Sequence, residues 1–306
     1  MTGRFAPSPT GELHLGNLRT AVVAWLSARA DQRPFIVRME DLDIVRATPE
    51  HAEAQLRDLA AIGIDWDGDV VLQSERFHLY QEALEQLGVD GSVYECYCSR
   101  RDIRLQIEAA SSAPHGPPGS YPGTCRDLTD AEREERRAAG RPPALRLRTT
   151  GETYQFVDRL VGRTTGPVDA VVLRRNDGVP AYNLAVVVDD GLQSVTDVVR
   201  GDDLLASTPR HLMLQRRLGI DTPSYLHIPL VNGSDGERLA KSHGATTLRE
   251  LRDAGTTVAD VVTWIARSLD LATATETPSL DQLRGRFDPA VLPRNAVEAP
   301  DFIRRR

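Results

Sequence analysis

The sequence predicts an α/β fold in which a parallel sheet with helical crossovers is interrupted by an inserted α+β segment and followed by a short helical C-terminal region. Strand and helix patterns alternate over residues 1–93, at lengths typical of parallel strands joined by crossover helices. The alternation stops at residues 94–173 and resumes at 174–244. Residues 245–306 are polar with helical spacing, so we expect one α/β domain in two halves, an insertion and a helical end.

The first strand-to-helix corner carries a candidate phosphate site. Residues 4–6 predict a short strand, which the loop APSPTG ends because prolines cannot extend a strand ladder. Apolar residues then recur at helical spacing up to about Ala30: Leu18, Val22, Trp25 and Leu26. His14 and Gly16 therefore lie where a helix begins, and free N–H groups with the helix dipole favour phosphate there. Taken alone, the same residues also fit an ordinary structural corner.

The next elements continue this unit. Residues 33–40 predict a buried strand that ends in an acidic cluster of Glu40, Asp41 and Asp43. Residues 48–63 and 74–88 predict helices, the first with a threonine cap, a proline in its first turn and a closing glycine. Ligands of such sheets bind at the carboxyl ends of the strands, which is where the proline loop and the acidic cluster fall. Caps and ion pairs are the structural alternative for the acidic cluster, and Arg38 is a candidate partner for it.

The second half of the chain predicts several further elements. Within the insertion, residues 129–140 predict a charged helix, and residues 143–149 and 153–162 predict short strands. Residues 171–190 predict a hairpin that turns at the sequence Asn-Asp-Gly. Residues 195–219 then predict a strand and a helix that opens with Ser-Thr-Pro.

Composition restricts the classes of function. The 306 residues are 41% hydrophobic and 26% charged, as in ordinary globular proteins, and the net charge is −7. No general field for polyanions exists, so a nucleic acid would have to contact a local basic patch. Three cysteines in a chain of this size, with no leader sequence and no apolar run of membrane-spanning length, indicate a cytoplasmic protein in a reducing compartment.

The three cysteines also predict a structural zinc site. Cys96 and Cys98 form a Cys-x-Cys pair, and Cys125 follows after a loop rich in proline and glycine. In a reducing compartment, neighbouring thiolates are metal ligands more often than disulfide partners. Spacing alone leaves His115 and Tyr121 as alternatives for the fourth ligand.

A second chemical element lies far downstream in the stretch GERLAKSHGA. Glycines flank Arg238, Lys241 and Ser242, so two cations lie on a loop that can move. Mobile lysine loops stabilise charge that moves between phosphate oxygens, although an isolated Lys-Ser pair also fits a solvated turn.

Considered together, these motifs resemble those of the class I aminoacyl-tRNA synthetases, which use a HIGH motif and a KMSKS loop around ATP. The stretches RFAPSPTGELHLGNLRTA, RMEDLD, AYNLAVVVDD and VVRGDDLLASTPRH are similar to the glutamyl branch, and the resemblance covers residues 1–245. Asn17 replaces the last histidine of HIGH and Arg238 replaces the first lysine of KMSKS, whereas Lys241 is retained.

The resemblance implies a Rossmann-like catalytic domain that uses ATP with Mg²⁺. It implies that Arg4 and Arg200 grip a carboxylate of glutamate and that Glu40 faces its ammonium group. The implied catalytic residues are His14 and Lys241. The implied ATP-binding residues are His14, Gly16, Asn17, Arg238 and Lys241, and the implied glutamate-binding residues are Arg4, Phe5, Ala6, Pro7, Ser8, Glu40, Tyr182 and Arg200. A Tyr-x-x-x-Cys pattern favours Tyr121 as the fourth zinc ligand, beside Cys96, Cys98 and Cys125.

About sixty residues follow Ser242, so we expect no anticodon-binding domain. In this the chain resembles the glutamyl-queuosine tRNA(Asp) synthetases, which attach glutamate to queuosine in tRNA(Asp). The resemblance implies glutamate activation without tRNA, and we expect a monomer. Candidate RNA contacts are Arg100, Arg101 and Arg104, or Arg304 to Arg306. The alternatives are a short glutamyl-tRNA synthetase charging a 3′ end, a pantoate-activating or related adenylyl-forming ligase, and a synthetase-like protein that only binds.

Overall fold

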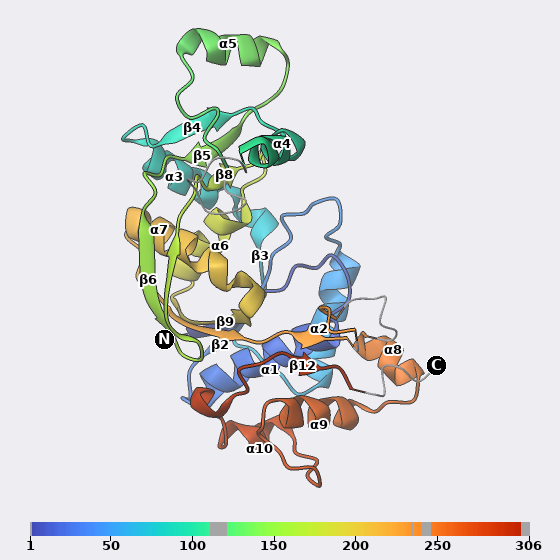
Figure 1. Cartoon of the computed structure of the whole chain (residues 1–306). Helices are drawn as coiled ribbons and strands as arrows, with labels where there is room; N and C mark the ends of the chain where they lie inside the picture. Colours follow the sequence, from blue (N-terminus) through green and yellow to red (C-terminus); the bar gives the residue numbers. More distant parts are fainter. Residues whose placement is uncertain (1, 111–120, 234, 240–245, 301–306) are drawn as a thin grey trace.

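A seven-stranded sheet forms the centre of the computed structural model, which describes residues 2–110, 121–233, 235–239 and 246–300 (Figure 1). The strand order is β3-β2-β1-β9-β10-β6-β7. All neighbouring strands are parallel except β6 and β7, which form an antiparallel hairpin. The strands are β1 (Thr2–Phe5), β2 (Phe35–Met39), β3 (Val71–Leu72), β6 (Thr153–Asp158), β7 (Gly162–Pro167), β9 (Val195–Gly201) and β10 (Ser224–Ile228). The direction of winding reverses between β1 and β9, and α/β sheets bind ligands beyond the carboxyl ends of the strands at such a point.

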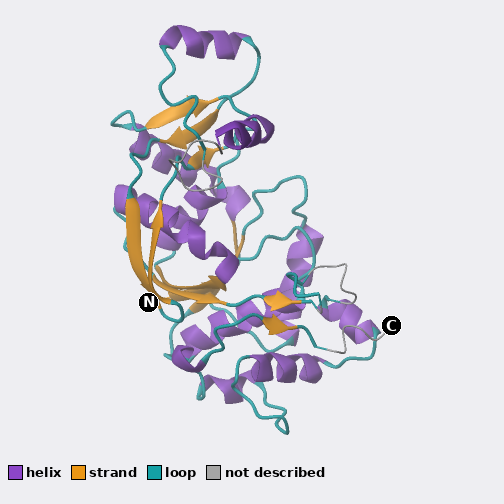
Figure 2. Cartoon of the chain, viewed as in Figure 1, coloured by secondary structure: helices purple, strands orange, loops and turns teal. Residues whose placement is uncertain are grey.

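Helices cover both faces of this sheet (Figures 1 and 2). One face packs against α1 (Leu15–Arg29), which in turn packs against α10 (Leu280–Arg284) and shares a core with α2 (Pro49–Ala61) and α9 (Val258–Ser268). The other face packs against α6 (Tyr182–Leu192) and α7 (Thr208–Leu218), and α3 (Phe77–Gly88) packs on these two helices around a second core. The predicted cap of α2 is confirmed, because the hydroxyl oxygen of Thr48 accepts a hydrogen bond from the His51 N–H at 3.2 Å.

The insertion contributes a separate antiparallel sheet at the far end of the molecule (Figure 1). Its strands are β4 (Val93–Cys96), β5 (Ala144–Leu147) and β8 (Val172–Arg174), and its helices are α4 (Arg100–Ala110) and α5 (Asp130–Ala138). No residue of α5 is buried, in agreement with its sequence, in which every residue but two alanines is charged. Strands β6 and β7 come from the same stretch of sequence but extend the main sheet, because β6 pairs with β10.

The predicted hairpin at residues 171–190 is wrong in its second arm. The turn forms, with Gly178 at φ +85°, but only one bridge follows it, between Arg174 and Pro180. The apolar run Leu184–Val188 then belongs to α6 and is buried between α3 and α7. A continuous apolar run has no periodicity that distinguishes a buried strand from a buried helix, so its packing partners decide.

The C-terminal part returns to the corner where α1 begins. Residues Leu248–Asp253 form α8, and β11 (Val231–Asn232) pairs in parallel with β12 (Val297–Glu298). The Leu15 N–H at the start of α1 donates to the carbonyl of Thr246 at 2.9 Å. Across the described ranges, none of the helices is both long and apolar enough to cross a lipid bilayer.

Candidate functional site

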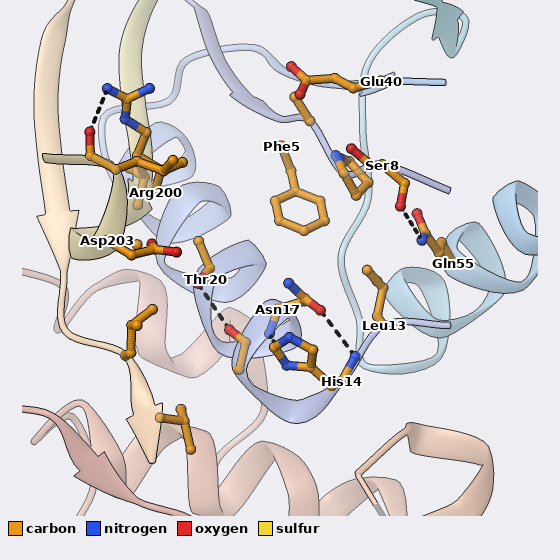
Figure 3. Close-up of a pocket in the computed structure, with 18 of the residues that line it drawn as sticks. Phe5, Ser8, Leu13, His14, Asn17, Thr20, Glu40, Gln55, Arg200 and Asp203 are labelled. Atoms are coloured by element: carbon orange, nitrogen blue, oxygen red, sulfur yellow. Dashed lines mark hydrogen bonds between the residues drawn. The ribbon is translucent and has the colours of Figure 1, made fainter. Parts of the chain in front are cut away.

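A cavity of about 570 Å³ opens at the carboxyl ends of β1 and β9, at the reversal of winding. Every ATP- or glutamate-binding residue predicted from the sequence lines it, apart from Lys241, which lies outside the described residues together with Ser242. These residues are Arg4, Phe5, Ala6, Pro7, Ser8, His14, Gly16, Asn17, Glu40, Tyr182, Arg200 and Arg238. Figure 3 shows Glu40 and Arg200 toward one end of the cavity and His14 with Asn17 toward the other.

The first turn of α1 shapes the histidine end of the cavity (Figure 3). The His14 N–H donates to Asn17 Oδ1 at 3.2 Å, and the Asn17 N–H donates to His14 Nδ1 at 3.3 Å. Because Nδ1 accepts, the proton of the neutral ring lies on Nε2. A Cβ on Gly16 would lie 3.1 Å from this ring. Glycine at this position therefore leaves room for the ring. Asn17 therefore preserves a cap where the family motif has histidine.

The ring of His14 is neutral near pH 7. Burial and the charge of Arg238 lower the pKa of His14 to about 4. Arg238 itself lies at the rim of the cavity, where its Nη1 pairs with Asp203 Oδ2 at 2.7 Å. Asp203 was not predicted as a site residue, although the acidic pair in RGDD directly follows a predicted strand.

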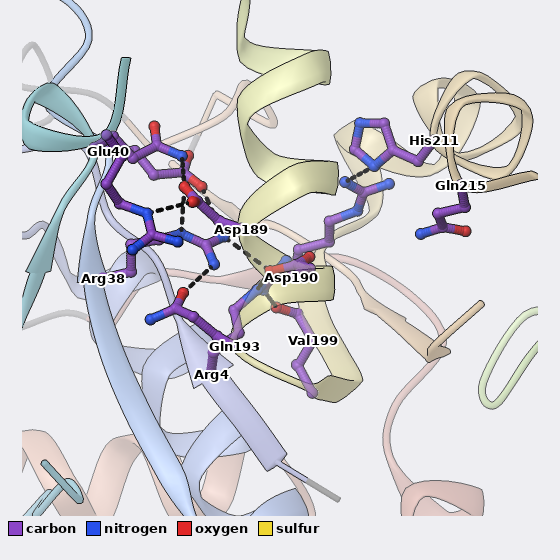
Figure 4. Close-up of polar contacts among 12 residues, drawn as sticks. Arg4, Arg38, Glu40, Asp189, Asp190, Gln193, Val199, His211 and Gln215 are labelled. Carbon is purple, nitrogen blue, oxygen red and sulfur yellow. Dashed lines mark hydrogen bonds and ion pairs between the residues drawn. The ribbon is translucent and has the colours of Figure 1, made fainter. Parts of the chain in front are cut away.

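A buried charge network holds Arg4 and Glu40 at the other end of the cavity (Figure 4). Arg38 is fully buried, and its Nη2 bonds Asp190 Oδ1 at 2.9 Å and Glu40 Oε1 at 3.4 Å. Arg4 shares the same Asp190 oxygen through Nε at 3.4 Å and donates from Nη1 to the Val199 carbonyl. Burial raises the pKa of Glu40 above its usual range, against the opposing charges of Arg38 and Arg4. Arg38 is thus an internal ion-pair partner, as the structural alternative predicted.

Asp189, which supports this network in the core, was not predicted as part of the site. Asp189 is fully buried and accepts hydrogen bonds from Tyr80, Gln73 and Arg76, at 2.7, 2.8 and 2.7 Å. Two adjacent acids at the end of the apolar run VVVDD were the available signal. Asp41 has the structural role expected for part of the acidic cluster, because it accepts from the N–H and hydroxyl of Ser74.

A second cavity, of about 770 Å³, adjoins the first. The two cavities share Ser8, Glu40 and Tyr182, and Tyr182 is 38% exposed. The other wall of the second cavity belongs largely to the insertion and includes four arginines, at positions 100, 141, 146 and 175. The two cavities therefore meet at Ser8, Glu40 and Tyr182.

The three cysteines form a group that can hold a metal. The ligand atoms of Cys96, Cys98 and Cys125 lie within 4.8 Å of one another, and the Cys98 and Cys125 sulfurs are 3.5 Å apart. The Tyr121 hydroxyl lies 3.4 Å from the Cys96 sulfur and 3.9 Å from that of Cys98. Ligands at about 2.3 Å around one tetrahedral zinc would be about 3.8 Å apart, so this donor set fits. His115 lies outside the described residues.

The phenol group of Tyr121 has one backbone hydrogen-bond donor and one cation beside it. This oxygen accepts the Cys125 N–H at 2.9 Å, and the Arg146 guanidinium lies 4.0 Å above the ring. Without a metal, burial and the bond to Cys96 raise the pKa of Tyr121 above its usual range. A bound cation would therefore have to lower it.

Comparisons with known proteins identify the family. Residues 1–275 match the family described as tRNA synthetases class I (E and Q), catalytic domain. The chain is 56% identical over 292 residues to a protein named glutamyl-Q tRNA(Asp) synthetase from Nocardia farcinica, covering 95% of this chain and 91% of that one. It is 46% identical to a protein of the same name from Symbiobacterium thermophilum, covering 98% and 96%.

A solved structure supports the same assignment. The glutamate-tRNA synthetase from Elizabethkingia anophelis superposes with a TM-score of 0.83 at 25% identity, covering 98% of this chain and 68% of that one. The predicted α/β fold with a parallel sheet is confirmed. The chain belongs to the class I tRNA synthetases of the E and Q type, a family of ligases, alongside relatives that are named glutamyl-Q tRNA(Asp) synthetase.

Proposed function

We propose that this chain activates L-glutamate with MgATP, without tRNA, and then transfers the glutamate to queuosine in the anticodon of tRNA(Asp). One observation carries the proposal: a single cavity is lined by the helix-start corner at His14 and by the charged side chains of Arg4, Glu40 and Arg200. The names of the relatives, and coverage of 91% and 96% of their lengths, support the acceptor. The reaction would take place in the cytoplasm.

In the activation step, an oxygen of the glutamate α-carboxylate attacks the α-phosphorus of ATP and forms a new P–O bond. The bond between the α-phosphorus and the oxygen that bridges to the β-phosphate breaks, and pyrophosphate leaves with its magnesium ion. A carboxylate is already ionised at neutral pH, so positioning and charge stabilisation suffice and no base is needed. His14 Nε2–H and the start of α1 would bind phosphate oxygens, and Lys241 would follow the charge onto pyrophosphate.

Each charged group of glutamate would be bound by a side chain of opposite charge. Glu40 would face the ammonium group, and Arg4 would bind a carboxylate through Nη2, for which the described residues offer no acceptor. The loop from Phe5 to Ser8 would add backbone contacts, and Tyr182 would close the side toward the second cavity.

In the transfer step, a hydroxyl of the queuosine cyclopentene-diol attacks the carbonyl carbon of glutamyl-adenylate. An ester forms, AMP leaves, and the hydroxyl proton passes to solvent or phosphate. The second cavity would admit the unstacked base, because it adjoins Glu40 and Tyr182 and has arginines along its wall for RNA phosphates. Arg100 lines this wall, whereas Arg304 to Arg306 lie outside the described residues.

The cysteine group would hold zinc through Cys96, Cys98, Cys125 and Tyr121. Bound zinc supplies four bonds that cross-link the first strand of the insertion to the turn at residue 125. Since Cys96 and Cys98 also line the second cavity, the cross-link would fix the wall on which the acceptor lies.

Two assays test the proposal. Glutamate-dependent ATP–pyrophosphate exchange should proceed without tRNA. Radiolabelled glutamate should then enter tRNA(Asp) only when queuosine is present, and nuclease digestion should recover the label in the anticodon fragment. Label at the 3′ end of tRNA(Glu) would instead establish a short glutamyl-tRNA synthetase and refute the acceptor. Absence of exchange with every amino acid would leave only a binding protein.

A further inference from the structure

The guanidinium of Arg200 is held by acceptors from several elements. Its Nε donates to His227 Nε2 at 3.0 Å, and its Nη1 contacts His211 Nδ1 at 3.2 Å. Its Nη2 donates to Thr208 Oγ1 at 2.9 Å and to the Leu204 carbonyl at 3.4 Å. Four of the five N–H groups of an arginine are thereby occupied, and the fifth lies on Nη1. Arg200 nevertheless lines the glutamate end of the cavity (Figure 3).

The contacts determine the state of both histidines. A guanidinium can only donate, so the nitrogens that face Arg200 carry lone pairs. His227 then donates from Nδ1 to Asp158 Oδ2 at 2.7 Å, and His211 donates from Nε2 to Asn183 Oδ1 at 3.0 Å. Burial lowers the pKa of both imidazoles, which agrees with neutral rings at pH 7.

Asp158 anchors this arrangement to the main sheet. It ends β6 and pairs in register with Tyr225 of β10. Its Oδ1 accepts from the N–H groups of Leu160 and Val161, both at 2.9 Å, so the carboxylate has little freedom to turn. Burial alone would raise the pKa of Asp158, but the His227 bond and these backbone bonds bring it below its usual value. A charged, fixed Asp158 keeps the Nδ1 tautomer of His227.

We propose that His211, His227 and Thr208 are positioning residues that fix Arg200 with one N–H toward the amino acid, and that this fixed position selects glutamate over aspartate. The inference deepens the proposed function and rests on it. Aspartate carries the same three charged groups as glutamate but is one methylene shorter. A guanidinium held by four hydrogen bonds cannot move toward the shorter aspartate side chain. A guanidinium that has lost one of these bonds can move and bind it.

The contrast with Arg4 supports this reading. Arg4 donates from Nε and Nη1 to two acceptors, Asp190 and the Val199 carbonyl. Its Nη2 has no acceptor among the described residues, so Arg4 can bind a carboxylate in more than one geometry. Selection by ligand length would therefore depend on Arg200.

The matched variants His211→Asn and His211→Leu test the proposal. Asparagine keeps an acceptor oxygen near the position of Nδ1, whereas leucine is of similar size and has none. We expect His211→Leu to raise KM for glutamate about tenfold or more in pyrophosphate exchange, since hydrogen bonds to charged groups have this effect. The ratio of kcat/KM for glutamate to that for aspartate should fall about tenfold, with KM for ATP unchanged. His211→Asn should stay within about threefold of wild type.

Thr208→Val provides a second variant of nearly the same shape, in case the leucine protein does not fold. It removes the Thr208 acceptor and should shift the glutamate-to-aspartate ratio in the same direction. Wild-type selectivity in folded His211→Leu and Thr208→Val proteins, judged by thermal unfolding, would overturn the inference and leave the proposed function standing. A wild-type protein that neither supports exchange with glutamate nor binds it by titration calorimetry would overturn both.

Discussion

Replacing Arg38 with methionine should strongly destabilise the protein at neutral pH. Arg38 is fully buried and faces three carboxylates, those of Glu40, Asp189 and Asp190, at 3.4, 3.7 and 2.9 Å. Removing one partner of a buried ion pair costs about 3–5 kcal/mol, because the other charge is left without compensation. For a chain of 306 residues, whose unfolding entropy is about 0.64 kcal/mol/K, that cost lowers Tm by roughly 5–8 °C.

The loss of stability of this variant relative to wild type should become smaller as the pH falls. Burial already raises the pKa of Glu40, and loss of Arg38 removes a charge that opposes this rise. In the variant, Glu40 therefore binds a proton more readily in the folded state than in the unfolded state. The free energy of unfolding of the variant is then higher in acid than at pH 7.5. Thermal unfolding of wild type and variant at pH 7.5 and pH 5.5 measures both effects. The double variant Arg38→Met with Glu40→Gln should recover part of the loss. A decrease in Tm below about 2 °C, or a deficit that grows in acid, would refute this account of the network.

Three further predictions concern the nucleotide and metal sites. Gly16→Ala should raise KM for ATP several-fold without changing KM for glutamate in pyrophosphate exchange, because its Cβ would lie 3.1 Å from the His14 ring; an unchanged KM for ATP would contradict the role of this corner. Lys241→Ala should lower the exchange rate at least roughly 100-fold if this lysine stabilises the transition state, and an unchanged rate would remove it from the mechanism. Metal analysis should find zinc in the wild-type protein and in His115→Ala but reduced zinc in Tyr121→Phe, whereas the reverse pattern would make His115 the fourth ligand.

Much of the lining of the first cavity could be predicted from the sequence because many of its residues lie close together in the chain. The residues Arg4 to Asn17 form one strand, loop and helix start, and a parallel sheet brings the end of β9 to the same edge. Caps and glycines define α2 and α5 for the same reason, since each signal lies within a few residues of its partner.

The polar partners of the site could not be predicted in this way. Asp189 and Asp190 meet Arg38 only because residues 182–192 are helical, and their apolar run equally fits a strand. Asp158 and His227 are 69 residues apart in sequence, and no pattern in either segment indicates the other. Their pairing depends on β6 joining the main sheet beside β10, which is a property of the tertiary fold.

The long-range charge network has a consequence for synthesis on the ribosome. Arg38 and Asp190 are separated by 152 residues, and Arg4 and Asp190 by 186. At about 5–20 residues per second, the interval between the emergence of Arg38 and that of Asp190 is roughly 8–30 s. During this time Glu40 is available to Arg38, but Asp190, the acid that Arg4 and Arg38 share, has not yet been made. We therefore expect the first two strands to complete their packing only after α6 has been made.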